Sequence, residues 1–338
     1  MDLLPPIPPK SDDLRFRDLP HRSSFEGNGF GVVTRKGKKM FMDDSYVTDP
    51  CFDGSSKKSF FGVYDGHGDG KAVKYVADNL HKNVLEMMKN CKEGKEEKEE
   101  ALKAAYLKTD RDFLEKDFKS GACCVTVLIQ DQEIIVSNLG DCRAVLCRGG
   151  VAVALTSDHK AGREDERQRI KHQAWRVAGA LAVSRSIGDA DLKKKKWVIA
   201  EPETRVLEIE EDMEFLVIAS DGLWDVVNNQ EAVETVLKAL PQGKTLRESE
   251  YENLIQGFDN LSPFPKRSRL SLVQEQKEVL PVESPKPEKE SPDREIGTSA
   301  SKSGTIKAAC KKLVDMAVSK GSRDDITVMI VDLNRYKC

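Results

Sequence analysis

The chain of 338 residues has no long hydrophobic run and no large excess of charge of either sign. A membrane-spanning helix needs about 20 consecutive apolar residues. No stretch of the sequence approaches that length, so we expect no membrane association. The net charge of −3 gives no basic field for a nucleic-acid backbone. Residues 1–6 are too short and too proline-rich for a secretory signal. We therefore expect a protein of the cytoplasm, the nucleus or both.

The sequence also lacks cysteine pairs with the spacing of a metal site. Its 8 cysteines are irregularly spaced, none forms a Cys-x-x-Cys pair, and the 5 histidines do not cluster near them. This spacing argues against a zinc site and against a disulfide framework. We expect reduced thiols, including the neighbours Cys123 and Cys124, which lie within an apolar run.

Short apolar and β-branched runs recur along the chain, each bounded by Gly, Asp or Ser, as is typical of buried strands. These runs are Phe60–Tyr64, Val125–Ile129, Ile134–Ser137, Ala144–Cys147, Phe215–Ala219 and Ile326–Val331. Other segments place apolar residues on one face of a helix. These segments are Lys71–Met88, Ala101–Phe118, Gln230–Leu240 and Thr305–Ser319. Strands and helices come in separate groups rather than in strict alternation, so we predict an α+β fold.

The composition predicts one domain with an interruption. Residues 1–26 are rich in Pro, Ser and charge and are predicted to be a flexible lead-in. The domain covers 27–334 and is followed by a tail over 335–338. Within it, residues 246–303 are dominated by Pro, Ser, Glu and Lys, which indicates a disordered insertion. We predict an insertion rather than a linker because the segment after it supplies an aspartate that the candidate site needs.

Three aspartates lie at the ends of predicted strands: Asp65, Asp221 and Asp324. In an antiparallel sheet the ends of some strands and the beginnings of others share one edge, so these carboxylates could converge. A fourth acidic segment, Asp43–Asp44, precedes another apolar stretch. Taken singly, each is better explained by a turn or a solvated acidic pair, and only their joint occurrence favours a site. Converging carboxylates repel one another and take up protons unless a cation is present. Mg²⁺ and Mn²⁺ prefer such oxygen ligands.

Six short segments carry the most specific signal. They are Met42–Asp44, Val63–Gly68, Gly140–Val145, Leu181–Asp189, Ala219–Val226 and Ser322–Val328. In order and register they resemble the motifs of the PP2C (PPM) family of metal-dependent protein serine/threonine phosphatases. Ser157–Lys160 and Ala200–Thr204 resemble its plant branch in particular. The resemblance extends from about Gly27 to Leu333, apart from the insertion.

The resemblance implies a β-sandwich of two antiparallel sheets flanked by helices, with two Mg²⁺ or Mn²⁺ ions in a cleft at one end. The residues implied in metal binding are, in chain order, Asp43, Asp44, Asp65, Gly66, Asp141, Asp221 and Asp324. Asp65 would bridge both metals, and the Gly66 carbonyl would touch one of them. Asp43 and Asp44 would act mainly through metal-bound waters. Asp141 matches a position that can hold a weaker third metal.

The implied activity is hydrolysis of phosphoserine and phosphothreonine in proteins by a metal-activated water, carried out by a monomer. Water between two cations loses its proton near neutral pH and can attack phosphorus in line with the departing oxygen. His67 is the candidate general acid, and Asp44 is grouped with it as catalytic. Lys39 stands where the family usually has an arginine that clamps the phosphate. It keeps the charge but loses the bidentate fork.

The largest departure from the family pattern follows Ile170. Relatives carry a Gly-Gly turn and a short extended stretch there, whereas only Lys171–Gln173 stand before the matching segment at Ala174. In the family this region forms a flap beside the active site. We expect the metal site to survive and substrate handling to change. The alternative is a catalytically impaired scaffold that binds a kinase or a phosphoprotein.

The predicted insertion contains a basic run at 266–272, Lys-Arg-Ser-Arg-Leu-Ser-Leu. It resembles a docking motif for mitogen-activated protein kinases, in which basic side chains meet an acidic patch and leucines enter an apolar groove. A solvated basic run and a nuclear localisation signal are alternative interpretations. The sequence leaves the three open.

Overall fold

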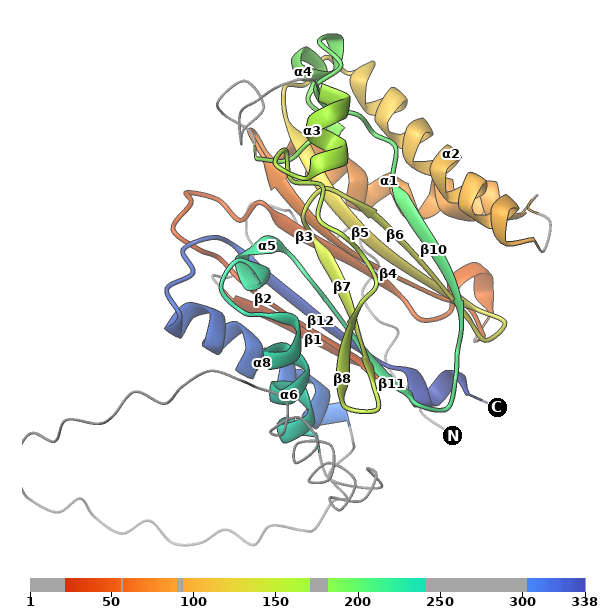
Figure 1. Cartoon of the computed structure of the whole chain (residues 1–338), viewed down its shortest axis with the longest axis vertical. Helices are drawn as coiled ribbons and strands as arrows, with labels where there is room; N and C mark the ends of the chain where they lie inside the picture. The colour runs from red at the N-terminus through yellow and green to blue at the C-terminus, as the bar shows by residue number, and fades with distance from the viewer. Residues whose placement is uncertain are drawn as a thin grey trace, which may run out of the picture. The chain divides into compact units, whose positions relative to one another are not determined.

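Two antiparallel sheets make up the centre of the structure, a computed structural model that describes residues 22–55, 57–89, 91, 94–170, 182–240 and 303–337 (Figure 1). In spatial order the first sheet contains β1 (Arg22–Gly27), β2 (Phe30–Arg35), β12 (Ile326–Asp332), β11 (Met213–Ala219), β7 (Arg143–Arg148) and β8 (Val151–Ala154). The second contains β10 (Glu203–Glu208), β6 (Glu133–Leu139), β5 (Gly121–Gln130), β4 (Ser59–His67) and β3 (Asp44–Asp49), with β9 (Ile187–Gly188) beside β5.

Helices cover the outer faces of both sheets (Figure 1). The helices are α1 (Lys71–Lys89), α2 (Lys95–Leu114), α3 (Glu164–Ile170), α4 (Ala190–Lys194), α5 (Asp221–Trp224), α6 (Asn229–Ala239) and α8 (Ser303–Ser319). Two 3₁₀ turns, η3 (Phe52–Gly54) and η4 (Leu333–Tyr336), complete the described elements. Helices α1 and α2 pack on the second sheet, and α6 and α8 pack on the first.

The core forms three apolar layers, and β5 shows why. Along this strand Val125, Val127 and Ile129 point between the two sheets, whereas Cys124 and Leu128 pack toward α1 and α2. Successive side chains of a strand point to opposite faces. A strand buried on both faces therefore reads as the continuous apolar run seen in the sequence.

Helices α6 and α8 lie against each other in opposite directions. Glu231, in the first turn of α6, pairs with Lys320, which follows the end of α8 (Nζ–Oε2, 2.5 Å). Further along, the hydroxyl of Thr235 lies 3.9 Å from the sulfur of Met316. The end of α6 and the beginning of α8 therefore lie at the same end of the helix pair.

The structure confirms the predicted fold class: two antiparallel sheets flanked by helices. All six predicted strands and all four predicted helices are present, although several boundaries shift by a few residues. Six strands of the described residues, β1, β2, β3, β8, β9 and β10, had not been predicted. Strand β10 mixes charged residues with its apolar ones and so lacks the apolar run of a central strand, whereas β8 is an apolar run, Val-Ala-Val-Ala, at an exposed edge of the first sheet.

Two predicted boundaries need correction. Strand β1 already begins at Arg22, within the predicted lead-in, because it pairs with β2 along its length and Phe25 packs against Phe30. The predicted tail is ordered as far as Tyr336, whose hydroxyl donates a hydrogen bond to Ser59 (2.9 Å). Residues 171–181, at the shortened flap, and 241–302, with the basic run at 266–272, lie outside the described residues. In the described part of the chain, no helix combines the length and apolar character of a membrane span.

The buried carboxylate of Glu166 ties α3 to the segment before β9. Glu166 is only 1% exposed. Its carboxylate accepts hydrogen bonds from Arg185 (Nη2–Oε1, 2.6 Å) and Arg169 (Nη2–Oε2, 2.7 Å). Burial alone would raise the pKa of Glu166, but the bonds from Arg185, Ser184 and Arg169 outweigh it, and its pKa is lowered.

We expect Glu166→Gln to lower the free energy of unfolding by about 1–3 kcal/mol at pH 7, because it removes the buried carboxylate to which the partly buried Arg169 and Arg185 donate. The folded pKa lies below the ordinary value of 4.5. The stabilisation is therefore complete above that pH and is lost as the pH falls through the folded pKa. Urea unfolding of both proteins between pH 7 and pH 3 would measure it. Glu164→Gln, at an exposed position of the same helix, should change stability by less than about 1 kcal/mol. Equal losses in both variants would contradict the assignment.

Candidate active site

Three carboxylates from distant parts of the chain meet where β3, β4 and β11 end or begin. Asp44 at the start of β3 pairs across the sheet with Asp65 of β4. Ser220, directly after β11, donates from Oγ to Asp44 Oδ2 (2.7 Å). The next residue, Asp221, opens α5 and shares a side-chain hydrogen bond with Asp65. The structure thus brings together Asp44, Asp65 and Asp221, which we call the acidic cluster.

Burial and mutual repulsion hold the protons on this cluster. Burial raises the pKa of Asp44 to about 8, against the opposing effect of the hydrogen bond from Ser220. Burial and the nearby charge of Asp141 raise the pKa of Asp221 to about 7. The pKa of Asp65 lies well above its ordinary value because of burial and the charges of Asp44 and Asp221. The protein alone therefore does not neutralise three ionised carboxylates here.

Asp141 extends the cluster on the side of β7. It is 6% exposed, and burial raises its pKa, although a hydrogen bond from the Cys123 thiol works in the other direction. The preceding Gly140 has φ +103°, and a Cβ there would lie 2.3 Å from the Cys123 sulfur, so only glycine fits. Burial also raises the pKa values of the Cys123 and Cys124 thiols. Neither cysteine is therefore a ready nucleophile.

Asp324 faces the cluster but is engaged by Lys39. The Lys39 ammonium lies 2.7 Å from Asp324 Oδ1. Burial alone would lower the pKa of Lys39, but the bond to Asp324 and the charges of Asp65 and Asp324 outweigh it and raise that pKa. Lys39 is therefore firmly cationic, and its charge points at the acidic cluster.

Asp325 fixes the loop that carries Lys39, a role that the sequence did not reveal. It is 1% exposed and accepts hydrogen bonds from two backbone amides of that loop, Gly37 N on Oδ1 and Asp43 N on Oδ2, each at 2.7 Å. The carbonyl of Asp43 in turn accepts from Gly66 N (2.9 Å). The β2–β3 loop, residues 36–43, is thus tied to the segment before β12 and to β4.

His67 ends β4 and is held by a partner from far along the chain. Its Nε2 lies 2.8 Å from Asp189 Oδ2, and Ser186 Oγ donates to the same oxygen (2.5 Å). Asp189 adopts the left-handed conformation (φ 55°). A Cβ on Gly121 would lie 2.2 Å from Asp189 Oδ2 and 2.3 Å from His67 Nε2. The lack of a side chain at Gly121 thus leaves room for this pair. The sequence did not predict the pair, although Asp189 ends one of the six motif segments.

The donor set fits hard divalent cations. Asp44 Oδ1 and Asp221 Oδ1 are buried and lack hydrogen-bond partners, and carboxylate oxygens are the ligands that Mg²⁺ and Mn²⁺ prefer. Among the described residues, however, no group of three or more His, Cys, Asp or Glu side chains is already arranged as a metal site. The ligand roles of Asp65, Gly66, Asp221 and Asp324, and the supporting roles of Asp43, Asp44 and Asp141, stay predictions.

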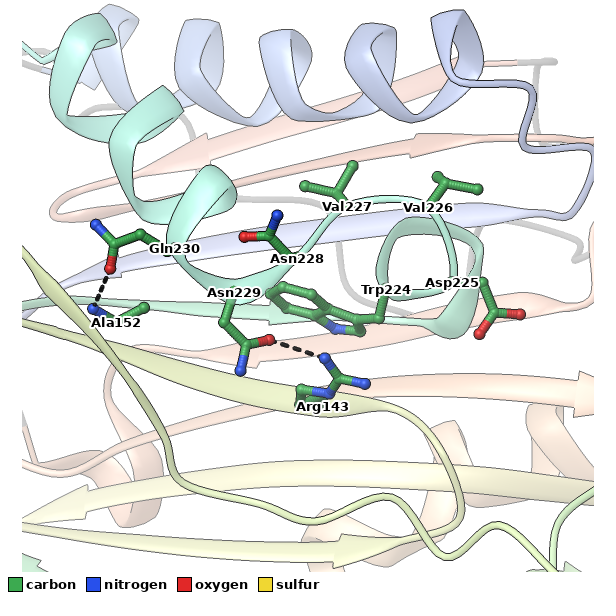
Figure 2. A pocket seen from close by; sticks show the side chains of 9 residues that line it. All are labelled: Arg143, Ala152, Trp224, Asp225, Val226, Val227, Asn228, Asn229 and Gln230. Carbon is green, nitrogen blue, oxygen red and sulfur yellow. Dashed lines mark hydrogen bonds between the residues drawn. The ribbon is translucent and has the colours of Figure 1, made fainter. Parts of the chain in front are cut away.

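An open pocket of about 600 Å³ lies beside the turn that begins with Asp221, but none of the clustered carboxylates lines it (Figure 2). Arg143 lies 5.2 Å from the Trp224 ring and donates to Asn229 (2.8 Å). It also forms a 2.7 Å ion pair with Asp158. Gln230 accepts a hydrogen bond from Ala152 N (2.9 Å). These side chains are engaged with one another or with neighbouring backbone, and none of the residues that line the pocket belongs to the acidic cluster.

Comparisons with known proteins identify the family of the chain. The family model "Protein phosphatase 2C" matches residues 28–254. "Probable protein phosphatase 2C 14" of Arabidopsis thaliana is 63% identical over 95% of this chain and 76% of its own length. "Probable protein phosphatase 2C 25" of the same plant is 41% identical over 92% of this chain and 66% of its own length.

Solved structures support the fold. A serine-threonine phosphatase 2C from Toxoplasma gondii superposes with a TM-score of 0.60 at 19% identity and covers 93% of this chain and 99% of that one. A sex determining protein from C. elegans superposes with a TM-score of 0.65 at 18% identity, over 91% of this chain and 65% of that one. The family model and the plant relatives, rather than these distant structures, establish that the chain belongs to the protein phosphatase 2C family of serine/threonine protein phosphatases.

Proposed function

We propose that this phosphatase hydrolyses phosphoserine and phosphothreonine in proteins with divalent cations held by its acidic cluster. The observation that carries the proposal is a set of buried carboxylates with raised pKa values and unpartnered oxygens, beside the cationic Lys39. Membership of a family that generally depends on Mg²⁺ or Mn²⁺ supports the same conclusion.

Asp65, Asp221 and Asp324, with the Gly66 carbonyl, would hold two cations. Asp43 and Asp44 would orient waters beside them, and Asp141 would serve a weaker third. When bound, the cations would supply an activated water as nucleophile and neutralise charge on the phosphoryl oxygens. Lys39 would bind a phosphoryl oxygen once it leaves Asp324. His67, held by Asp189, would donate a proton to the departing serine or threonine oxygen.

The wider expectations stay predictions. These include action as a monomer in the cytoplasm or nucleus, altered substrate handling by the shortened flap, and kinase docking by the run at 266–272. A scaffold without catalysis is the competing outcome for the first experiment below.

Phosphate release from a phosphothreonine peptide should require Mn²⁺ or Mg²⁺ and stop with a chelator. Asp221→Asn should lower metal-dependent release at least about 100-fold, because it removes a charged ligand. Without metal it should unfold at a temperature no lower than the wild type, since one repelling carboxylate is gone. Asp225→Asn, at an exposed position one turn on, is the matched control and should stay active. A folded wild-type protein without metal-dependent release would favour the scaffold.

Lys39→Ala should raise KM for the phosphopeptide about 10–100-fold, the range expected for loss of a hydrogen bond to a charged group. Lys39→Arg should lower KM below that of the wild type, because the guanidinium can bind two phosphoryl oxygens at once. Steady-state kinetics with saturating Mn²⁺ would measure both. Lys38→Ala, on the exposed neighbour, should leave KM within about twofold. If Lys38→Ala and Lys39→Ala behave alike, Lys39 has no specific role.

His67→Asn should lower kcat on a phosphothreonine peptide by about 10²–10⁴-fold, the usual contribution of a general acid. The loss should be much smaller on p-nitrophenyl phosphate, because nitrophenolate leaves without needing a proton. Comparing kcat on the two substrates at one pH gives the result. Equal losses on both would mean that His67 supports the site rather than protonating the leaving group.

A further inference from the structure

The most exposed large apolar side chains of the described residues are neighbours in the chain. Met40 is 83% exposed and Phe41 is 58% exposed. Both belong to the β2–β3 loop, between Lys39 and the metal motif that starts at Met42. Exposed apolar groups that stand together, rather than singly, commonly mark a binding surface.

The loop is held in place at several points, so these side chains are presented rather than free to collapse. Asp325 binds the amides of Gly37 and Asp43, one on each side of the apolar pair. Lys38 N donates to the Arg323 carbonyl (2.8 Å). A Cβ on Gly37 would lie 2.3 Å from that same carbonyl oxygen, so the backbones are in close contact. A surface fixed before binding loses little freedom when a partner arrives.

The position of the pair defines what can reach it. Lys39, the residue next to Met40, contacts Asp324 at the acidic cluster. Asp43, two residues after Phe41, is tied to Gly66 of the metal motif. Consecutive α-carbons are only 3.8 Å apart. A phosphorylated residue whose phosphate lies at Lys39 therefore brings its own sequence neighbours over Met40 and Phe41.

We propose that Met40 and Phe41 form a specificity surface that contacts an apolar side chain of the phosphoprotein within about two residues of the phosphorylated serine or threonine. The inference rests on the proposed function. Methionine adapts to differently shaped side chains, and phenylalanine adds a large apolar area. Neither side chain can bind a charged or strongly polar neighbour in compensation for its desolvation. The enzyme therefore selects phosphosites flanked by apolar residues over those flanked by polar ones.

The test compares phosphothreonine peptides that carry Leu or Ser at the two positions on either side of the phosphothreonine. The wild-type protein with Mn²⁺ should show a kcat/KM about 10-fold higher for the Leu peptide, the discrimination expected from a partly exposed apolar contact. In the double variant Met40→Ser/Phe41→Ser this ratio should fall to within about twofold. Activity on the Ser peptide and on p-nitrophenyl phosphate should stay near the wild-type value, because neither side chain supplies a group to the acidic cluster.

A matched control removes exposed apolar groups elsewhere. Val151→Ser/Val153→Ser, on the outer strand β8, should keep the 10-fold ratio. If the wild-type enzyme is active but shows no preference for the Leu peptide, this inference is overturned and the proposed function stands. If the wild-type protein is inactive on every substrate, with and without Mn²⁺, the proposed function itself is overturned. Equal losses on all substrates in the Met40/Phe41 variant would show a structural role. If sedimentation shows that the wild-type protein is a dimer and the Met40/Phe41 variant a monomer, the surface is a contact with a second copy of the chain. Either result would overturn the inference.

Discussion

Repulsion among buried carboxylates is the constraint to which the rest of the site responds. Asp44, Asp65 and Asp221 lie close enough to raise one another's pKa values, and Asp141 adds to the effect. Such crowding opposes folding unless protons or cations compensate. Cations that bind there would stabilise the folded chain as well as supply chemistry, because their binding free energy adds to that of folding.

The scaffold keeps these groups together despite their repulsion. Each carboxylate stands on a strand or directly beside one, and the layers on both sides of the sheets are closely packed. Asp325 and Asp189 extend this rigidity to the parts that would meet the substrate. Asp325 fixes the β2–β3 loop with its lysine and apolar pair, and Asp189 fixes His67. Both are buried acidic residues whose partners lie in distant segments, so the precision of the site derives from long-range contacts.

The reliance of the site on long-range contacts explains which of its features could be predicted from the sequence. The central strands β4, β5 and β11 are apolar runs, and their aspartates follow or lie within recognisable motifs, so the fold class and the convergence of Asp65 with Asp221 were accessible. The His67–Asp189 pair was not, because nothing local links positions 122 residues apart. The clamp formed by Asp325 was hidden for the same reason, and the engagement of Asp324 by Lys39 depends on three-dimensional placement. Strand β10 was not predicted because charged residues interrupt its apolar pattern.

The antiparallel arrangement of α6 and α8 has a consequence for how this chain can vary. Since α6 ends and α8 begins at the same end of the helix pair, residues added between them lengthen a loop without requiring either helix to move. The entropy of closing such a loop grows with the logarithm of its length, and doubling the length costs only about 0.6 kcal/mol. Relatives could therefore gain or lose whole regulatory segments at this point while the catalytic domain keeps its stability. The same junction is a natural position for a circular permutation or an inserted reporter domain.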